Sequence, residues 1–136
     1  MAFLGMLGKK SPQIAEKFSP YMVTTEWFPY KFYSNKKGSS ILFVKLKNLT
    51  NEPLLTSFLV ELPGKLSFDE IGLAKEKLTK VGEIKPMEEK ELRFNVFNSI
   101  GIEPGEYTVT LTTTAHYQNY DKVINVVRKR TSVGVV

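Results

Sequence analysis

The sequence GEYTVTLTTTAHY, residues 105–117, alternates between two kinds of side chain without a break. One face would carry Tyr107, Val109, Leu111, Thr113, Ala115 and Tyr117, and the other Thr108, Thr110, Thr112, Thr114 and His116. Successive side chains leave opposite sides of a pleated strand, so this period of two predicts a strand with one buried face. Threonine suits the outward face, because it is β-branched and polar. We therefore expect the central strand of an antiparallel β domain here.

Other segments of the chain share this alternation. They are residues 21–28, 41–49, 54–62, 78–84 and 90–97, and a last strand ends at residue 136. About seven short strands without long helices between them predict an all-β fold, an Ig-like antiparallel β-sandwich. Tyr107 follows the Pro104-Gly105 turn, where such a fold can place a corner tyrosine that returns its hydroxyl to nearby backbone.

Two stretches lack a clear period. Residues 65–77 predict an irregular crossover, with or without one turn of helix, and residues 123–127 fit a helix as well as a strand. Pro29 cannot donate to a strand ladder, so it should interrupt the first strand or place it at a sheet edge. The segment 30–33 can then resume that strand.

The length of 136 residues suits one domain with a core of its own. We divide the chain into an N-terminal extension, residues 1–20, and a β-sandwich domain, residues 21–136. Ser11 and Pro12 can begin a short helix, so the extension is predicted to be helical or irregular.

The first eight residues are apolar. We expect Phe3, Leu4 and Leu7 to dock on the outward side chains of Ile41 and Phe43, in the same chain or in a neighbouring copy. Shallow insertion into a membrane surface is the alternative.

The residue types present exclude several kinds of chemistry. The chain has no cysteine, so it has no disulfide, no thiolate metal site and no cysteine nucleophile, and His116 is its one histidine. Its nine glycines never take the spacing of a phosphate-binding loop. Glu88, Glu89 and Glu91 fall in a turn with lysines and predict a solvated cluster. We therefore expect no enzyme, no metal and no cofactor, because no nucleophile–base pair can be assembled.

Location and charge add two further expectations. The absence of cysteine and the position of Lys9 and Lys10 after the apolar octet, the wrong order for a secretory signal, predict a cytoplasmic protein. The net charge is +5, and residues 1–50 carry eight lysines against two glutamates. Such an excess can attract a polyanion, either nucleic acid or an anionic membrane surface.

Five aromatic residues and a lysine crowd into the segment WFPYKFY, residues 27–33. Such a cluster can anchor a protein interface or stack on bases or sugars, although packing in the core and at a sheet edge is the ordinary alternative. The candidate interaction surface consists of Trp27, Phe28, Tyr30, Lys31, Phe32 and Tyr33, together with Phe3, Leu4 and Leu7. We expect a non-catalytic interaction or structural module with a protein partner. It can also form a homo-oligomer through the N-terminal segment or an edge strand, and polyanion binding is the alternative function.

Three turn sequences resemble those of a known family. They are VKLKNLTNEPL (44–54), GEIKPMEEKELRFNV (82–96) and EPGEYTVTLT (103–112). An Asn-rich turn, a Pro turn followed by acids and a P-G-x-Y entry to a strand are similar to those of Ig-like CARDB and related archaeal β-sandwich domains. The resemblance spans about residues 40–115. Pro86-Met87 departs from the Pro-Gly common there, and the 65–80 crossover is long. The resemblance implies an adhesion, spacer or protein-binding module, and it concerns turns and no active site.

Overall fold

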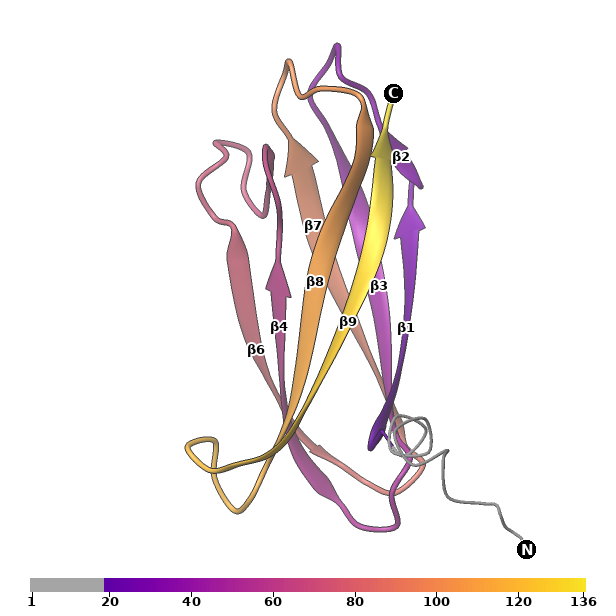
Figure 1. The fold of residues 1–136 in the computed structure, drawn as a ribbon, viewed down its shortest axis with the longest axis vertical. Helices are drawn as coiled ribbons and strands as arrows, with labels where there is room; N and C mark the ends of the chain where they lie inside the picture. The colour runs from indigo at the N-terminus through magenta and orange to yellow at the C-terminus, as the bar shows by residue number, and fades with distance from the viewer. Residues whose placement is uncertain (1–18) are drawn as a thin grey trace, which may run out of the picture.

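The computed structural model describes residues 19–136, and they form two β-sheets packed face to face (Figure 1). The strands are β1 (Tyr21–Phe28), β2 (Lys31–Phe32), β3 (Gly38–Asn48), β4 (Leu54–Glu61), β5 (Leu66–Ser67), β6 (Glu76–Ile84), β7 (Glu89–Asn98), β8 (Gly105–His116) and β9 (Val123–Val135). One sheet has the order β1-β3-β7-β5 and the other β2-β9-β8-β4-β6. The predicted all-β, Ig-like sandwich is confirmed, with seven long strands and two of two residues each. Residues 19–136 contain no helix, and hence none that could cross a membrane.

Strand β8 is the centre of the five-stranded sheet, between β9 and β4, as its alternation predicted. Val109, Leu111, Thr113 and Ala115 are buried. The prediction fails at the end of the strand, because Tyr117 is exposed and His116 is buried. The register between β8 and β9 shifts between Ala115 and His116. A bulge of this kind breaks the period of two. The local sequence alternates through this point and gives no sign of the bulge.

The core is the apolar layer between the two sheets. Leu42, Val44 and Leu46 of β3 are fully buried, in keeping with the predicted alternation of residues 41–49, and they face the other sheet. The fully buried side chains of that sheet include Phe58, Val60, Val109 and Leu111. Burial of one such side chain stabilises the fold by roughly 1.5–3 kcal/mol. This layer supplies most of the free energy that holds the sheets together.

A polar contact also crosses the core at one end. The hydroxyl of Tyr21 on β1 lies 2.6 Å from Oγ1 of Thr56 on β4, and both residues are buried. Burial raises the pKa of the Tyr21 hydroxyl, and the hydrogen bond with Thr56 opposes that effect. Because the two strands belong to different sheets, this bond fixes how the sheets are placed along each other.

Pro29 interrupts the first strand, as predicted, and the chain changes sheets there. Before it, β1 pairs antiparallel with β3; after it, β2 pairs parallel with the end of β9. The Phe28–Pro29 peptide bond is cis. Figure 1 shows β1 and β2 following one another along the same side of the sandwich. The segment 30–33 thus begins a strand of the second sheet and does not resume β1.

The 65–77 crossover contains no turn of helix. It forms the short edge strand β5 and then a loop that the carboxylate of Asp69 holds. Oδ1 accepts hydrogen bonds from the backbone N–H of Gly72 at 2.6 Å and of Leu73 at 2.9 Å, and Oδ2 accepts one from Ala74 at 3.0 Å. These hydrogen bonds lower the pKa of Asp69, and the bond from Leu73 has the largest effect. Residues 123–127, which fitted helix or strand, are part of β9.

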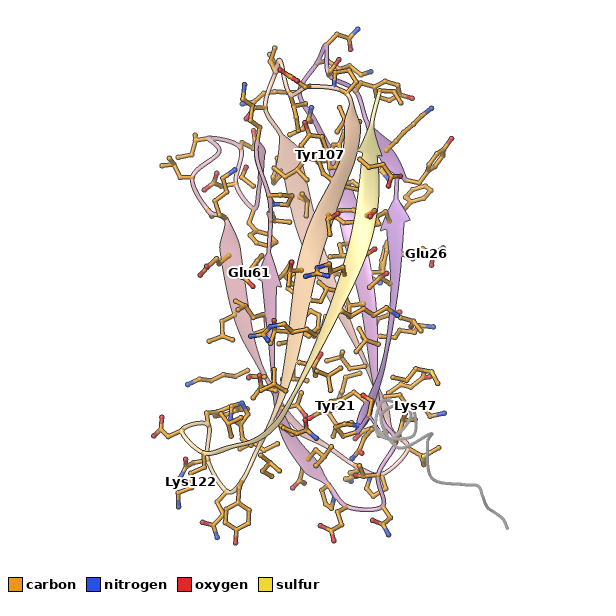
Figure 2. The ribbon with its side chains drawn as sticks, viewed as in Figure 1. Tyr21, Glu26, Lys47, Glu61, Tyr107 and Lys122 are labelled. Carbon is orange, nitrogen blue, oxygen red and sulfur yellow. The ribbon has the colours of Figure 1, made fainter. Side chains whose placement is uncertain are left out.

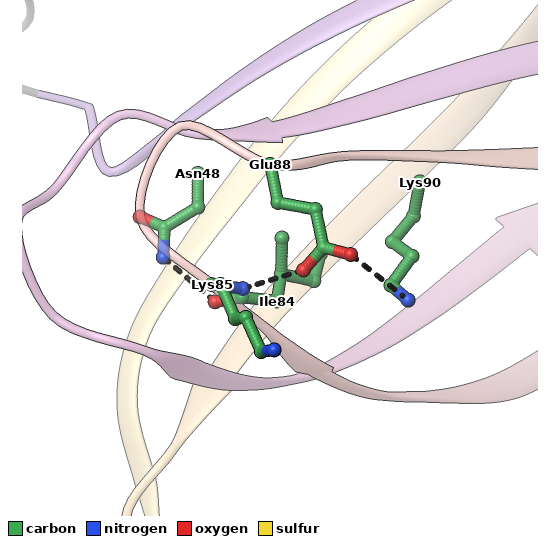
Figure 3. Close-up of polar contacts among 5 residues, drawn as sticks. All are labelled: Asn48, Ile84, Lys85, Glu88 and Lys90. Carbon is green, nitrogen blue, oxygen red and sulfur yellow. Dashed lines mark hydrogen bonds and ion pairs between the residues drawn. The ribbon is translucent and has the colours of Figure 1, made fainter.

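Asn48 ties two turns together at one end of the sandwich (Figure 3). Its side chain is fully buried, and Nδ2 donates to the backbone oxygens of Glu52 and Ile84, each at 2.8 Å. Oδ1 accepts from the backbone N–H and the hydroxyl of Thr50, at 2.8 and 2.7 Å. Every polar atom of the side chain has a partner, which a buried amide requires.

The neighbouring turn closes on Glu88 (Figure 3). Its Oε1 accepts a hydrogen bond from the backbone N–H of Lys85 at 2.8 Å, and its Oε2 lies 3.3 Å from Nζ of Lys90. The backbone bond from Lys85, followed by the contact with Lys90, lowers the pKa of Glu88. Met87 has a φ of 61°, the left-handed conformation that glycine would adopt more easily. The Pro86-Met87 pair therefore makes this turn without a glycine.

Tyr107 forms the predicted corner. Its hydroxyl donates to the backbone oxygen of Glu103 at 2.6 Å. A Cβ added to Gly64, whose φ is 55°, would lie only 3.3 Å from the Tyr107 ring. The corner thus attaches the turn before β8 to the turn after β4, near the end of the sandwich opposite Tyr21 (Figure 2).

The two faces of β8 can be tested by truncation. Leu111→Ala removes a fully buried side chain and should lower the free energy of unfolding by roughly 2–5 kcal/mol. Thr110→Ala, on the outward face, should lower it by less than about 1 kcal/mol. Urea unfolding of both variants measures the difference, and equal effects would contradict the assignment of faces.

The role of Asn48 can be tested in the same way. Asn48→Ala leaves the buried oxygen of Ile84 without its partner and should lower the free energy of unfolding by about 2–3 kcal/mol. Lys47→Ala, one residue earlier, is the control and should change it by less than about 0.5 kcal/mol. A loss for Asn48→Ala no larger than for the control would show that the two turns hold without it.

Candidate functional site

The aromatic segment 27–33 divides into buried and exposed members. Trp27 and Phe32 belong to the core, with exposed fractions of 9% and 2%. Their ring centroids lie 6.5 Å apart, edge to face, and Nε1 of Trp27 donates to Oγ1 of Thr131 at 3.3 Å. This corrects the prediction of one exposed surface for Trp27 and Phe32, which pack between the sheets because the chain changes sheets between them.

The other members form a cluster on the surface. Phe28, Tyr30 and Tyr33 are 69%, 71% and 43% exposed. Nζ of Lys31 lies 5.4 Å from the ring centroid of Tyr30 and 5.5 Å from that of Tyr33, and Nζ of Lys36 lies 5.2 Å from that of Tyr33. Ammonium groups within about 6 Å of a ring are attracted to its face. We call Phe28, Tyr30, Lys31, Tyr33 and Lys36 the aromatic corner.

Hydrogen bonds hold the backbone beneath the aromatic corner. Nδ2 of the buried Asn98 donates to the backbone oxygens of Tyr33 and Lys36, at 3.0 and 3.1 Å. The N–H of Ser34 donates to the oxygen of Val136 at 2.8 Å. A binding surface on ordered backbone loses less conformational entropy when a partner binds. Lys36 and Asn98 were not among the predicted site residues. The crowding of Ser, Asn and Lys in residues 34–37 predicted a turn, but nothing in it indicated that Asn98 would hold its backbone.

Phe28 connects the aromatic corner to a hollow on the outer face of the four-stranded sheet. The hollow has a volume of about 500 Å³ and is lined by Phe28 and Phe43 with the charged side chains of Glu26, Lys45 and Glu91. Phe43 was one of the two predicted docking positions, and the guanidinium of Arg93 lies 5.4 Å from its ring centroid. The predicted docking residues Phe3, Leu4 and Leu7 lie outside the described residues.

The structure also pairs a hydroxyl with an imidazole. Oγ of Ser57 lies 2.7 Å from Nε2 of His116, a contact that the expected absence of any nucleophile–base pair did not allow for. Both residues are buried, and the ring of Tyr120 covers His116 edge to face at 5.1 Å. Among residues 19–136, Nδ1 of His116 has no hydrogen-bond partner, whereas a serine nucleophile needs both access and an oriented base. The pair joins β4 to β8, and the contact with Tyr120 links it to the loop between β8 and β9.

The described part of the chain offers little to a metal ion. It contains no group of three or more histidine, cysteine, aspartate or glutamate side chains that could hold one. Glu89 and Glu91 stand opposite Lys47 and Lys45 in the pairing of β3 and β7.

These features define an Ig-like β-sandwich domain with an aromatic and basic corner at one sheet edge. No protein-family model matches the sequence, and no curated protein matches it. Among solved structures, the chain is similar to native alpha-2-macroglobulin from Escherichia coli in a crystal structure spanning domain MG7 to the C-terminus. The TM-score is 0.59 at 19% identity, over 85% of this chain and 17% of that chain. An electron cryo-microscopy structure of the native conformation of the same protein gives a TM-score of 0.58 at 16% identity. That match covers 87% of this chain and 7% of that chain.

A third similar structure is the CARDB domain of a Pyrococcus furiosus protein, described in complex with di-metal ions. The identity is 24%, the TM-score 0.49, and the match covers 88% of this chain and 91% of that one. This is the kind of domain that the turn sequences resemble. The chain spans less than a fifth of the two macroglobulin chains. Similarities of this size concern the fold alone.

The division of the aromatic segment predicts opposite effects of truncation. Phe32→Ala should lower the free energy of unfolding by roughly 3–5 kcal/mol, because it empties a buried site. Tyr30→Ala should change it by less than about 0.5 kcal/mol, because its ring is 71% exposed. Denaturant unfolding measures both, and a large loss for Tyr30→Ala would mean that the aromatic corner has a structural role.

Proposed function

We propose that this protein is a non-catalytic interaction module that binds a protein partner through the aromatic corner. The observation that carries the proposal is the exposure of three aromatic rings, Phe28, Tyr30 and Tyr33, on backbone that other residues hold in place. Tyrosine supplies a large contact area with few rotatable bonds, and aromatic residues are enriched among the positions that dominate binding energy. An isolated exposed ring needs no explanation, whereas two tyrosine rings joined through Lys31, with the exposed Phe28 two residues before Tyr30, favour an interface.

Two observations support a non-catalytic role. The macroglobulin structures match this chain over an Ig-like part of a much longer protein, which is consistent with a binding or structural module. The hydroxyl–imidazole pair that the described residues form, Ser57 with His116, is buried, and the Tyr120 ring packs against the imidazole. A fold does not define a function by itself, so the proposal rests on the aromatic corner and on the burial of Ser57 and His116.

Polyanion binding is the second candidate, and the lysines of the aromatic corner favour it. Lys31 and Lys36 lie over the rings of Tyr30 and Tyr33, so a basic group and a stacking face occur at the same place. Single-stranded nucleic acids bind to surfaces of that composition. The rest of the basic excess lies partly in residues 1–18, outside the described residues.

The proposal predicts that removal of two rings weakens partner binding. A Tyr30→Ala/Tyr33→Ala variant should bind a partner at least about 30-fold more weakly, the loss expected for two residues at the centre of an interface. Tyr117→Ala is the matched control, because Tyr117 is 57% exposed but lies in the loop after β8. The partner is captured from cell extract on the immobilised wild-type protein, and its affinity for each variant is then measured with purified components. Equal affinities for all three proteins would contradict a role for the aromatic corner.

Salt dependence separates the two candidate functions. Binding to a polyanion releases counterions, so its affinity should fall by more than about tenfold between 50 and 200 mM salt if three phosphates are contacted. Binding of a protein through aromatic rings should change far less over that range. Titration with a single-stranded oligonucleotide at both salt concentrations tests the alternative, and tight, salt-sensitive binding there would favour it over a protein partner.

A further inference from the structure

Strand β9 has a long unpaired edge. It pairs with β8 from end to end, but on its other side, among the residues that the structure describes, only Gly134 and Val135 pair, with β2. Next to these, Thr131 accepts the hydrogen bond from Trp27, and Nζ of Lys129 donates to the backbone oxygen of Val23 at 2.5 Å. Among residues 19–136, no strand pairs with the outer side of residues 123–128. We call residues 123–127 the free edge.

The free edge is apolar and β-branched. Val123, Ile124 and Val126 are 59%, 57% and 43% exposed. Sheet edges are usually protected by charged side chains, proline or short strands, because their unpaired N–H and C=O groups attract further strands. Strand β6, the other edge of the same sheet, has such protection, since it exposes Glu76, Lys77 and Lys80. The free edge has none between Lys122 and Arg128.

The charges around the free edge indicate what can bind there. Arg128, Lys129 and Arg130 follow it directly, and all three are exposed. A symmetric antiparallel pair of two copies centred on Asn125 would place Lys122 of one copy opposite Arg128 of the other, and each chain carries a net charge of +5. Like charges opposite each other destabilise strand pairing. The site therefore suits a strand with acidic residues better than it suits a second copy.

We propose that the free edge binds an extended peptide segment of another protein by strand addition, with apolar residues beside Val123–Val127 and acidic residues beside Arg128–Arg130. Main-chain hydrogen bonds to an exposed sheet edge supply affinity in this mode, and alternate side chains supply specificity. The site is separate from the aromatic corner, which adjoins Gly134 through β2. Ten residues of strand separate Ile124 from Gly134, about 33 Å. Figure 2 shows Lys122 beyond the end of the sandwich opposite Tyr107.

Synthetic peptides test the proposal on the full-length protein. One peptide has alternating valine and threonine followed by three aspartates, and a second has the same residues in reverse order, so that both strand directions are tested. Two control peptides carry lysines in place of the aspartates. We expect one of the two acidic peptides to bind at least about tenfold more tightly than either lysine peptide, measured by calorimetry. Hydrogen exchange of the backbone amides in residues 123–128 should slow when it binds. Equal binding of acidic and basic peptides, or no binding of any, would overturn the proposal.

Two variants identify the site. Val126→Lys places a charge on the free edge and should abolish binding, whereas Ile71→Lys, at a position 76% exposed in the 65–77 crossover, should not. The double variant Arg128→Glu/Arg130→Glu should reverse the preference from acidic to basic peptides. Circular dichroism and thermal unfolding confirm that each variant is folded. A wild-type dimer that Val126→Lys converts to a monomer would show that a second copy occupies the free edge and would refute the proposed partner.

The aromatic corner provides an independent control. Tyr30→Ala/Tyr33→Ala should retain peptide binding in full, because its substitutions lie beside the opposite end of β9. Loss of peptide binding in that variant would place the peptide at the aromatic corner and refute the site at the free edge. Loss of peptide binding in Val126→Lys, with binding retained in Tyr30→Ala/Tyr33→Ala, supports the free edge whether or not the aromatic corner binds a protein partner.

Discussion

The contact between the two inner faces of the sheets is the interaction on which the rest of this structure depends. Leu42, Val44 and Leu46 of β3 pack with Phe58 and its neighbours in a layer that excludes water. A slip of one residue in β3 would turn Lys45 and Lys47 into that layer, so burial fixes the register as well as the association of the sheets. The turns, the corner tyrosine and both candidate surfaces are positioned by that register.

Polar groups complete the ends of this layer, where apolar packing stops. Asn48 and Asn98 stand at opposite ends of the four-stranded sheet, and both are buried with partners for their amide groups. Asn48 holds the turns around Glu52 and Ile84, and Asn98 holds the backbone of Tyr33 and Lys36. A buried amide without partners would be strongly destabilising, so each loop is tied to its asparagine. The aromatic corner owes its ordered backbone to this second contact.

The two candidate surfaces lie at the two ends of β9 (Figure 1). A sheet must end somewhere, and its last strand keeps unpaired backbone groups. Here β2 and the aromatic corner occupy one end of the β9 edge, Lys129 and Thr131 contact β1 in the middle, and the free edge remains at the other end. One strand thus offers two different chemistries to partners, aromatic and basic at one end and apolar at the other. The cytoplasmic location and the docking of Phe3, Leu4 and Leu7 stay predictions.

The sequence by itself determined the inward faces of β3, β4, β7 and most of β8, and the corner role of Tyr107, because alternation and turn residues are local properties. Only the tertiary structure decided which of the five aromatic residues in 27–33 are buried. Trp27 and Phe32 face the core from different sheets, and the change of sheet at Pro29 depends on strands β3 and β9, far away in the sequence. The burial of His116 likewise follows from a register shift against β9, and residues 123–127 became strand because β8 pairs with them. Pairing partners of this kind are non-local, so no local pattern encodes them.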